Sequence, residues 1–151
     1  MTPAKGYLTF NKADLVIALD ESKYTLTKVY DGQPISVALD KENGLIISGL
    51  VNEEDINDIN LTNLTLNVVG TNNGNWKATP YVLKLSGATA EFYDITYVGS
   101  SYTITKRPLN ITTFDQTLVK GQAYNLNQDA YKITNTAANE GLVDDATKVF
   151  K

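Results

Sequence analysis

Short runs in which hydrophobic and polar residues alternate recur along this chain, and turn residues separate them. Alternation places successive side chains on opposite faces of a strand, so each run predicts a strand with one buried face. No convincing helical spacing interrupts these runs. The predicted strands are two within 7–19 that meet near Lys12–Asp14, and then 24–30, 35–39, 45–47, 64–68, 81–85, 93–97 and 102–104.

The segments between the strands also carry local predictions. Asn43-Gly44 lies between two apolar runs, which is a strong signal for a β-hairpin. Residues 48–59 are acidic and predict a loop or a single helical turn, and 70–77 predict a long turn. Many short strands of this kind predict an all-β fold, which we expect to be an antiparallel β-sandwich. A β-grasp-like α+β fold is the alternative, since it also offers short strands with one apolar face.

An internal repeat organises the chain. The segment Leu8–Ile17 recurs as Tyr102–Ile111, with Lys106-Arg-Pro-Leu109 in the place of Lys12-Ala-Asp-Leu15. Gly141-Leu-Val-Asp144 likewise resembles Gly49-Leu-Val-Asn52. Repeats of this length indicate an array of modules. We therefore predict a complete repeat over 1–107, with 108–151 either starting a second repeat or supplying strands that complete the first domain.

Composition excludes several classes of function. The chain has neither cysteine nor histidine, which removes disulfides, thiolate sites, Ser-His and Cys-His relays and most zinc sites. Its net charge is −4 and Arg107 is its only arginine, so nucleic acid is a poor partner. No apolar run approaches the roughly 20 residues that cross a bilayer, so we expect no membrane insertion by this segment. We also expect a protein that is not an enzyme and needs no cofactor.

Four landmarks occur in order: Lys28-Val-Tyr-Asp-Gly32; Gly49-Leu-Val-Asn-Glu53; Asn73-Gly74 with Tyr81–Gly87; and Tyr93-Asp-Ile-Thr-Tyr97 with Tyr102–Leu109. This pattern, over about 8–112, resembles the mucus-binding-like (MBG/YDG) repeats of large bacterial surface adhesins. The resemblance implies an extracellular parent protein attached to the bacterial surface, with neighbouring repeats forming a stalk or a binding array. One departure is that Glu53-Glu-Asp55 follows Asn52, where typical members have glycine and a small or acidic residue.

The candidate ligand site is the turn that carries the single tryptophan. Trp76 could stack on a sugar ring while Asn73 and Asn75 hydrogen-bond to its hydroxyls, and Tyr81 follows in the next strand. Alternatively, Trp76 covers a sheet edge, the asparagines only supply turn conformations, and the tyrosines are cross-strand packing. The expected partners are host mucin or glycans. The alternatives are a spacer without a ligand and an accessory module of a secreted carbohydrate-active enzyme.

The acidic loop offers a second set of polar side chains. Glu53, Glu54, Asp55 and Asp58 could present the oxygen ligands that calcium prefers, and Asp55 with Asp58 could form a hydrolytic carboxylate pair. EF-hand spacing is absent, however, and a solvated acidic loop explains the same residues. We therefore predict no catalytic residue and no metal site here.

Overall fold

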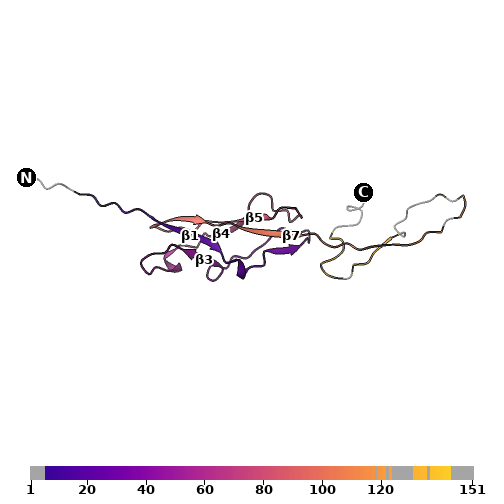
Figure 1. The fold of residues 1–151 in the computed structure, drawn as a ribbon, viewed down its shortest axis with the longest axis horizontal. Coiled ribbons are helices and arrows are strands. Elements are labelled where there is room, and N and C mark those ends of the chain that lie inside the picture. Colours follow the sequence, from indigo (N-terminus) through magenta and orange to yellow (C-terminus); the bar gives the residue numbers. More distant parts are fainter. Residues whose placement is uncertain (1–5, 118, 122, 124–130, 136, 144–151) are drawn as a thin grey trace, which may run out of the picture. The chain divides into compact units, whose positions relative to one another are not determined.

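The computed structural model describes residues 6–117, 119–121, 123, 131–135 and 137–143. Within this part the chain is built from strands, with two short 3-10 turns and no α-helix (Figure 1). The predicted all-β class is therefore confirmed, and the described residues contain no α-helix of the kind that the β-grasp alternative requires. The elements are β1 (Ala13–Leu19), η1 (Glu21–Lys23), β2 (Thr27–Val29), β3 (Leu45–Ser48), η2 (Ile56–Asp58), β4 (Thr65–Val68), β5 (Tyr81–Ser86), β6 (Tyr93–Tyr97), β7 (Ser100–Thr105), β8 (Ile111–Thr113) and β9 (Tyr131–Ile133).

The chain divides into two units, and each contains several separate segments. Unit 1 consists of Met1–Leu26, Ser36–Thr71 and Thr79–Thr103. Unit 2 consists of Thr27–Ile35, Asn72–Ala78 and Ile104–Lys151. The expected boundary at residue 107 stays a prediction.

Unit 1 contains a three-stranded sheet with the order β3-β1-β6. β1 pairs antiparallel with β3, with Ile17 opposite Ile47. It pairs parallel with β6, where Ile17 lies opposite Tyr97. The expectation of purely antiparallel pairing is therefore wrong: the sheet is mixed, because β1 and β6 are far apart in sequence and a long connection lets them run in the same direction.

Alternation explains the core of unit 1. β5 pairs antiparallel with β4 and β7, and every second residue of β5 is buried. Tyr81 lies opposite Tyr102, and both rings are buried as the cross-strand packing alternative expects. In β1 the same alternation buries Leu15, Ile17 and Leu19, while the other face is half-buried or exposed. The largest fully buried side chains are Leu15, Ile17, Leu64, Leu83 and Leu85.

Two predicted strands near the start of the chain do not form. Residues 7–10 are exposed and irregular, and 35–39 are not a strand, so Asn43-Gly44 does not close a hairpin. The carboxylate of Asp40 instead accepts hydrogen bonds from the backbone N–H groups of Glu42 and Asn43, both at 3.0 Å. This turn leads directly into β3, whose partner is the distant β1 rather than the preceding segment.

Unit 2 contains β2, the last residues of β7, and the pair β8-β9. β7 belongs to the sheet with the order β2-β7-β5-β4. The unit boundary falls within β7, so Ile104 and Thr105 belong to unit 2. The Tyr30 N–H donates to the carbonyl oxygen of Thr105 at 2.9 Å. β8 pairs antiparallel with β9, and Ile111 lies opposite Ile133. In the described part of the chain, no helix has the length and apolar character that crossing a membrane requires.

Candidate functional site

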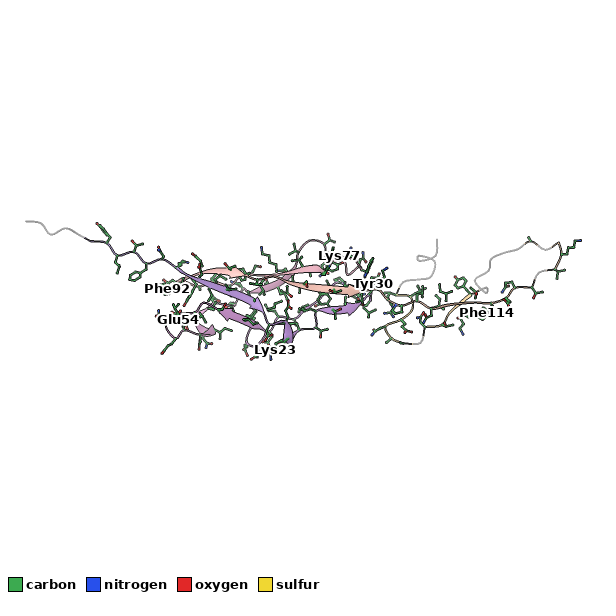
Figure 2. The ribbon with its side chains drawn as sticks, in the orientation of Figure 1. Lys23, Tyr30, Glu54, Lys77, Phe92 and Phe114 are labelled. Carbon is green, nitrogen blue, oxygen red and sulfur yellow. The ribbon has the colours of Figure 1, made fainter. Side chains whose placement is uncertain are left out.

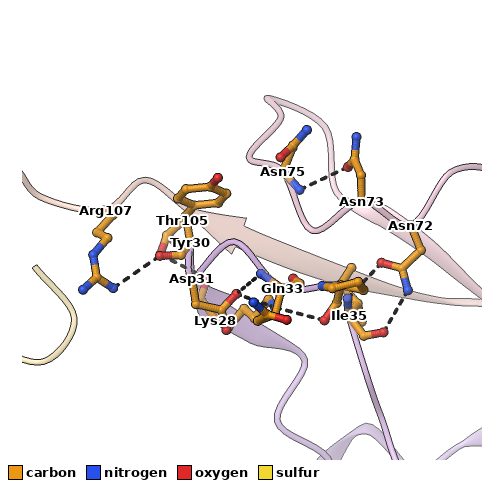
Figure 3. Close-up of polar contacts among 11 residues, drawn as sticks. Lys28, Tyr30, Asp31, Gln33, Ile35, Asn72, Asn73, Asn75, Thr105 and Arg107 are labelled. Carbon is orange, nitrogen blue, oxygen red and sulfur yellow. Dashed lines mark hydrogen bonds and ion pairs between the residues drawn. The ribbon is translucent and has the colours of Figure 1, made fainter. Parts of the chain in front are cut away.

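The segment that carries Trp76 is fastened to the Gln33–Ile35 backbone (Figure 3). The side chain of Asn72 accepts a hydrogen bond from the Ile35 N–H and donates one to the Ile35 carbonyl oxygen, both at 2.8 Å. Gly74 lies so close to the Gln33 carbonyl that a Cβ atom would stand 1.9 Å from its oxygen. Asn72 and Gly74 therefore hold this loop in place, and Gly74 must remain without a side chain.

A second set of contacts holds the Gln33 segment that lies against Gly74. The Lys28 ammonium group donates to the Asp31 carboxylate at 2.8 Å and to the Gln33 carbonyl at 2.6 Å. The Asp31 carboxylate also accepts the Gln33 N–H at 3.0 Å. The hydrogen bond from Lys28 and then that from Gln33 hold the pKa of Asp31 below its usual value. The Lys28-to-Gly32 landmark thus forms a closed polar turn that supports the Trp76 loop.

Arg107 ties the Lys106-Arg-Pro108 segment to the loop that contains Gly141. Its guanidinium group donates to the carbonyl oxygens of Gly141 at 2.8 Å, Ala138 at 2.8 Å and Glu140 at 2.7 Å. A longer bond of 3.4 Å reaches the Tyr30 carbonyl. The planar fork of arginine suits several acceptors at fixed positions. This side chain is therefore a structural link within unit 2.

A pocket of about 310 Å³ lies within unit 2, lined by Trp76 and by residues of the Arg107 link. Trp76 lines it and is 44% exposed, and the Lys106 Nζ atom lies 4.4 Å from the centroid of the indole ring. That distance is within the range of a cation–π interaction. Cationic residues line the pocket, and no acidic side chain does so among the described lining residues. The lining residues are Tyr30, Trp76, Lys106, Arg107, Leu109, Gly141, Leu142 and Val143.

The predicted site residues do not all gather at this pocket. Asn73 and Asn75 belong to the Trp76 loop but do not line the pocket. The Asn75 N–H donates to the Asn73 side-chain oxygen at 3.1 Å, as the turn-forming alternative expects. Tyr81 is 3% exposed in the core of unit 1, so its ring cannot present a binding surface, and we remove it from the candidate site. Sequence analysis missed Tyr30 and Leu142, although both belong to recurrent motifs.

The acidic loop forms a capped turn. Asp55 caps η2 by accepting the Asn57 N–H at 2.7 Å, and Asp58 accepts the Asp55 N–H at 2.8 Å. The Tyr93 hydroxyl donates to the Glu54 carboxylate and accepts the Val51 N–H at 3.0 Å. The bond to Glu54 raises the pKa of Tyr93. These carboxylates hold the loop, and we assign no catalytic role to them.

The described residues contain no cluster of three or more acidic side chains placed to hold a metal ion. What the Trp76 pocket can do chemically is to stack an apolar ring face and attract an anion. Comparison of the chain with protein-family models, with curated proteins and with solved structures finds no match.

Proposed function

We propose that this chain is a non-enzymatic repeat module of a bacterial surface adhesin that contributes to attachment to host mucus or glycans through the Trp76 pocket. The observation that carries the binding role is the half-exposed indole of Trp76 beside Lys106 in an apolar pocket. An indole face stacks on the C–H groups of a sugar, while the exposed ammonium group attracts a carboxylate or sulfate. Acidic or sulfated mucin sugars are therefore the preferred ligands.

The repeat organisation is supported by two equivalent pairings. β1 begins at Ala13, within Lys12-Ala-Asp14, and pairs antiparallel with β3, while β8 follows Lys106-Arg-Pro108 and pairs antiparallel with β9. A Cβ atom on Gly49 would stand 2.3 Å from the Asp14 carbonyl oxygen. The Gly141 N–H donates to the carbonyl oxygen of Pro108, the counterpart of Asp14, at 2.9 Å. The first glycine of each Gly-Leu-Val element thus lies beside the corresponding residue of its own repeat, which is Asp14 in the first copy and Pro108 in the second.

A sandwich arrangement of unit 1 belongs to the same proposal. The buried faces of β1 and β5 supply four of the five largest fully buried side chains, which is the pattern expected where two sheets share a core. As in other adhesive arrays, we expect each module to bind weakly and many modules to bind firmly together. Linked modules gain effective concentration without any new contact.

Mucin and a glycan array that contains neutral, sialylated and sulfated sugars provide the test. The chain is displayed in many copies on a bead and compared with Trp76→Ala. A sugar that covers about 50 Å² of the exposed indole contributes about 1.3 kcal/mol, so each site should weaken about tenfold. The multivalent beads should then lose retention, most of all on acidic sugars.

A matched control removes an aromatic ring elsewhere. Phe92 is 66% exposed in unit 1 (Figure 2), so Phe92→Ala deletes a comparable surface ring without touching the pocket. Phe92→Ala should retain glycans as the wild type does, and circular dichroism should show both variants folded. If the wild-type beads retain no glycan or mucin, the adhesive role fails and the chain is a spacer. Retention on one polysaccharide alone would favour an accessory module of a carbohydrate-active enzyme.

A further inference from the structure

The two copies of the repeated strand differ in how many neighbours they have. β1 lies between β3 on one side and β6 on the other. β8 pairs with β9 alone among the strands that the structure describes. Aligning Lys12 with Lys106 makes Ile111 the counterpart of Ile17, and each of the two lies opposite an isoleucine of its antiparallel partner strand, Ile133 and Ile47. β8 therefore repeats the β3 side of β1, and its other edge corresponds to the position of β6.

The hydrogen bonds fix which edge of β8 has no partner strand among the described residues, and we call it the open edge. The Thr134 N–H donates to the Asn110 carbonyl at 3.2 Å, and the Asn110 N–H donates to the Asn135 side chain at 2.9 Å. Asn110 thus directs its backbone toward the β9 side. Successive residues of a strand direct these groups to opposite edges, so those of Leu109 and Ile111 point away from β9.

In the first copy, the corresponding groups are bonded to β6 and its flanking residues. The Ala13 N–H donates to the Phe92 carbonyl, and the Val98 N–H donates to the Ile17 carbonyl, both at 2.9 Å. Ile17 is the counterpart of Ile111. The backbone groups of Ile17 face the parallel strand β6 in unit 1, and those of Ile111 face the open edge in unit 2. By this correspondence, the edge presents the backbone groups that β1 presents to the parallel strand β6.

The side chains of the two copies also differ in how far they are exposed to solvent. Ile17 is 0% exposed, whereas Ile111 is 46% exposed and the nearby Phe114 is 49% exposed (Figure 2). An apolar side chain on an unpaired strand edge favours addition of another strand. In unit 1 the added strand is β6, whose sequence is Tyr93-Asp-Ile-Thr-Tyr97.

We propose that the open edge of β8 binds, in parallel, a strand with the β6 pattern Tyr-x-Ile-x-Tyr, supplied by another repeat of the same type. This inference rests on the proposed repeat organisation. Main-chain hydrogen bonds to Leu109, Ile111 and Thr113 provide the affinity, and the isoleucine and tyrosine side chains of the incoming strand select the sequence by covering Ile111. Successive modules of an array are then joined by a shared sheet as well as by the chain.

The test adds a synthetic peptide of residues 91–99 to the full chain and follows amide hydrogen exchange by NMR. The amides of Ile111 and Thr113 should become protected at least about tenfold when the peptide is saturating. The control peptide is N-methylated at Asp94 and Thr96, which occupy alternate positions of β6 that face β1. It keeps every side chain and should give no protection.

A substitution in β8 itself tests the same edge. Ile111→Pro removes an N–H that points away from β9, so the β8-β9 pairing can persist while the edge loses a donor. Peptide protection of Thr113 should then disappear. The proposal is overturned if the peptide leaves Ile111 and Thr113 unprotected at millimolar concentration, or if both peptides protect them equally.

These outcomes are separable from those of the proposed function. Glycan retention that persists when the peptide does not bind removes only the strand-addition inference. Peptide binding without glycan retention keeps the repeat organisation and removes the adhesive role. If the chain alone forms a dimer in which β8 amides are already protected, the edge is occupied by β8 of a second copy, and the proposed β6-type partner is wrong.

Discussion

Replacing Arg107 by lysine should loosen the loop that contains Gly141 while leaving the net charge unchanged. Three short hydrogen bonds join the guanidinium group to the carbonyl oxygens of Gly141, Ala138 and Glu140. A lysine ammonium group cannot reproduce the fork and can keep about one of them. Hydrogen bonds from a charged donor contribute about 1.5–3 kcal/mol each. Since the site is partly exposed, we expect a net local loss of about 2–3 kcal/mol.

Amide hydrogen exchange measures this loss directly. The Gly141 N–H is bonded to the Pro108 carbonyl, and its exchange reports opening of the loop. In Arg107→Lys this amide should exchange about 30- to 150-fold faster than in the wild type. The Ala13 N–H in unit 1, bonded to the Phe92 carbonyl, should exchange at its original rate and serves as the internal reference.

A variant of the neighbouring residue separates the fork from the charge. Lys106→Gln removes a positive charge beside Arg107 and leaves the three short hydrogen bonds in place. It should change the exchange of Gly141 only slightly. The structural role of the fork is refuted if Arg107→Lys accelerates exchange by less than about threefold, which corresponds to about 0.6 kcal/mol, or if both variants accelerate it equally.

Four further substitutions test unit 1 by chemical denaturation. Gly49→Ala should cost more than about 2 kcal/mol, because φ is +101° and the new Cβ would stand 2.3 Å from a carbonyl oxygen. Gly70→Ala should cost only about 1 kcal/mol, because φ is +83° but the space around Gly70 is open. Equal losses of stability in the two variants would contradict the account. Glu53→Gly should stabilise by about 0.5–1 kcal/mol, since Glu53 has φ +62°, and a loss would show that its side chain matters more than its backbone. Tyr93→Phe should lower the stability of unit 1 at neutral pH, because it removes both hydrogen bonds of the hydroxyl group. The pKa of Tyr93 is raised in the folded state, so the stabilisation by its hydroxyl group is full below pH about 10 and falls as pH rises through the folded pKa. The free energies of unfolding of the wild type and Tyr93→Phe should therefore converge in alkaline solution. A difference that stays constant with pH would exclude this coupling.

Strands that alternate regularly could be predicted from the sequence. In β5, Tyr81, Leu83 and Leu85 are buried as the two-residue period requires. The period does not name the partner of a strand, and the parallel pairing of β1 with β6 is fixed by the tertiary structure. The hairpin expected at Asn43-Gly44 fails for the same reason, since β3 finds its partner in β1 rather than in the preceding residues.

The candidate site was predictable only in part. Trp76 could be identified because it is a lone aromatic residue in a polar turn, and its neighbours Asn73 and Asn75 share that turn. Its pocket depends on residues brought together by folding, such as Tyr30 and Leu142. Tyr81 was included because it follows the Trp76 turn in the next strand, but its face of β5 is core, and a two-residue period cannot say which face water reaches.

The glycine expected after Asn52 has a physical explanation in the backbone. Asn52 and Glu53 both have left-handed φ values, +57° and +62°. Glycine adopts such φ values without steric cost, while this chain places a glutamate there. The turn is held by its acidic neighbours, since Glu54 accepts a hydrogen bond from Tyr93 and Asp55 caps η2. The chain therefore forms this turn with a glutamate in the second left-handed position.

The most direct test of the central claim is an NMR titration of the chain with sialylated and sulfated mucin oligosaccharides. The chain contains one tryptophan, so the indole N–H signal belongs to Trp76 alone. The account predicts that this signal and the methyl signals of Leu142 and Val143 shift together and saturate at millimolar sugar, while signals from the core of unit 1 stay unchanged. An indole signal that does not move at that concentration would contradict the proposed binding role.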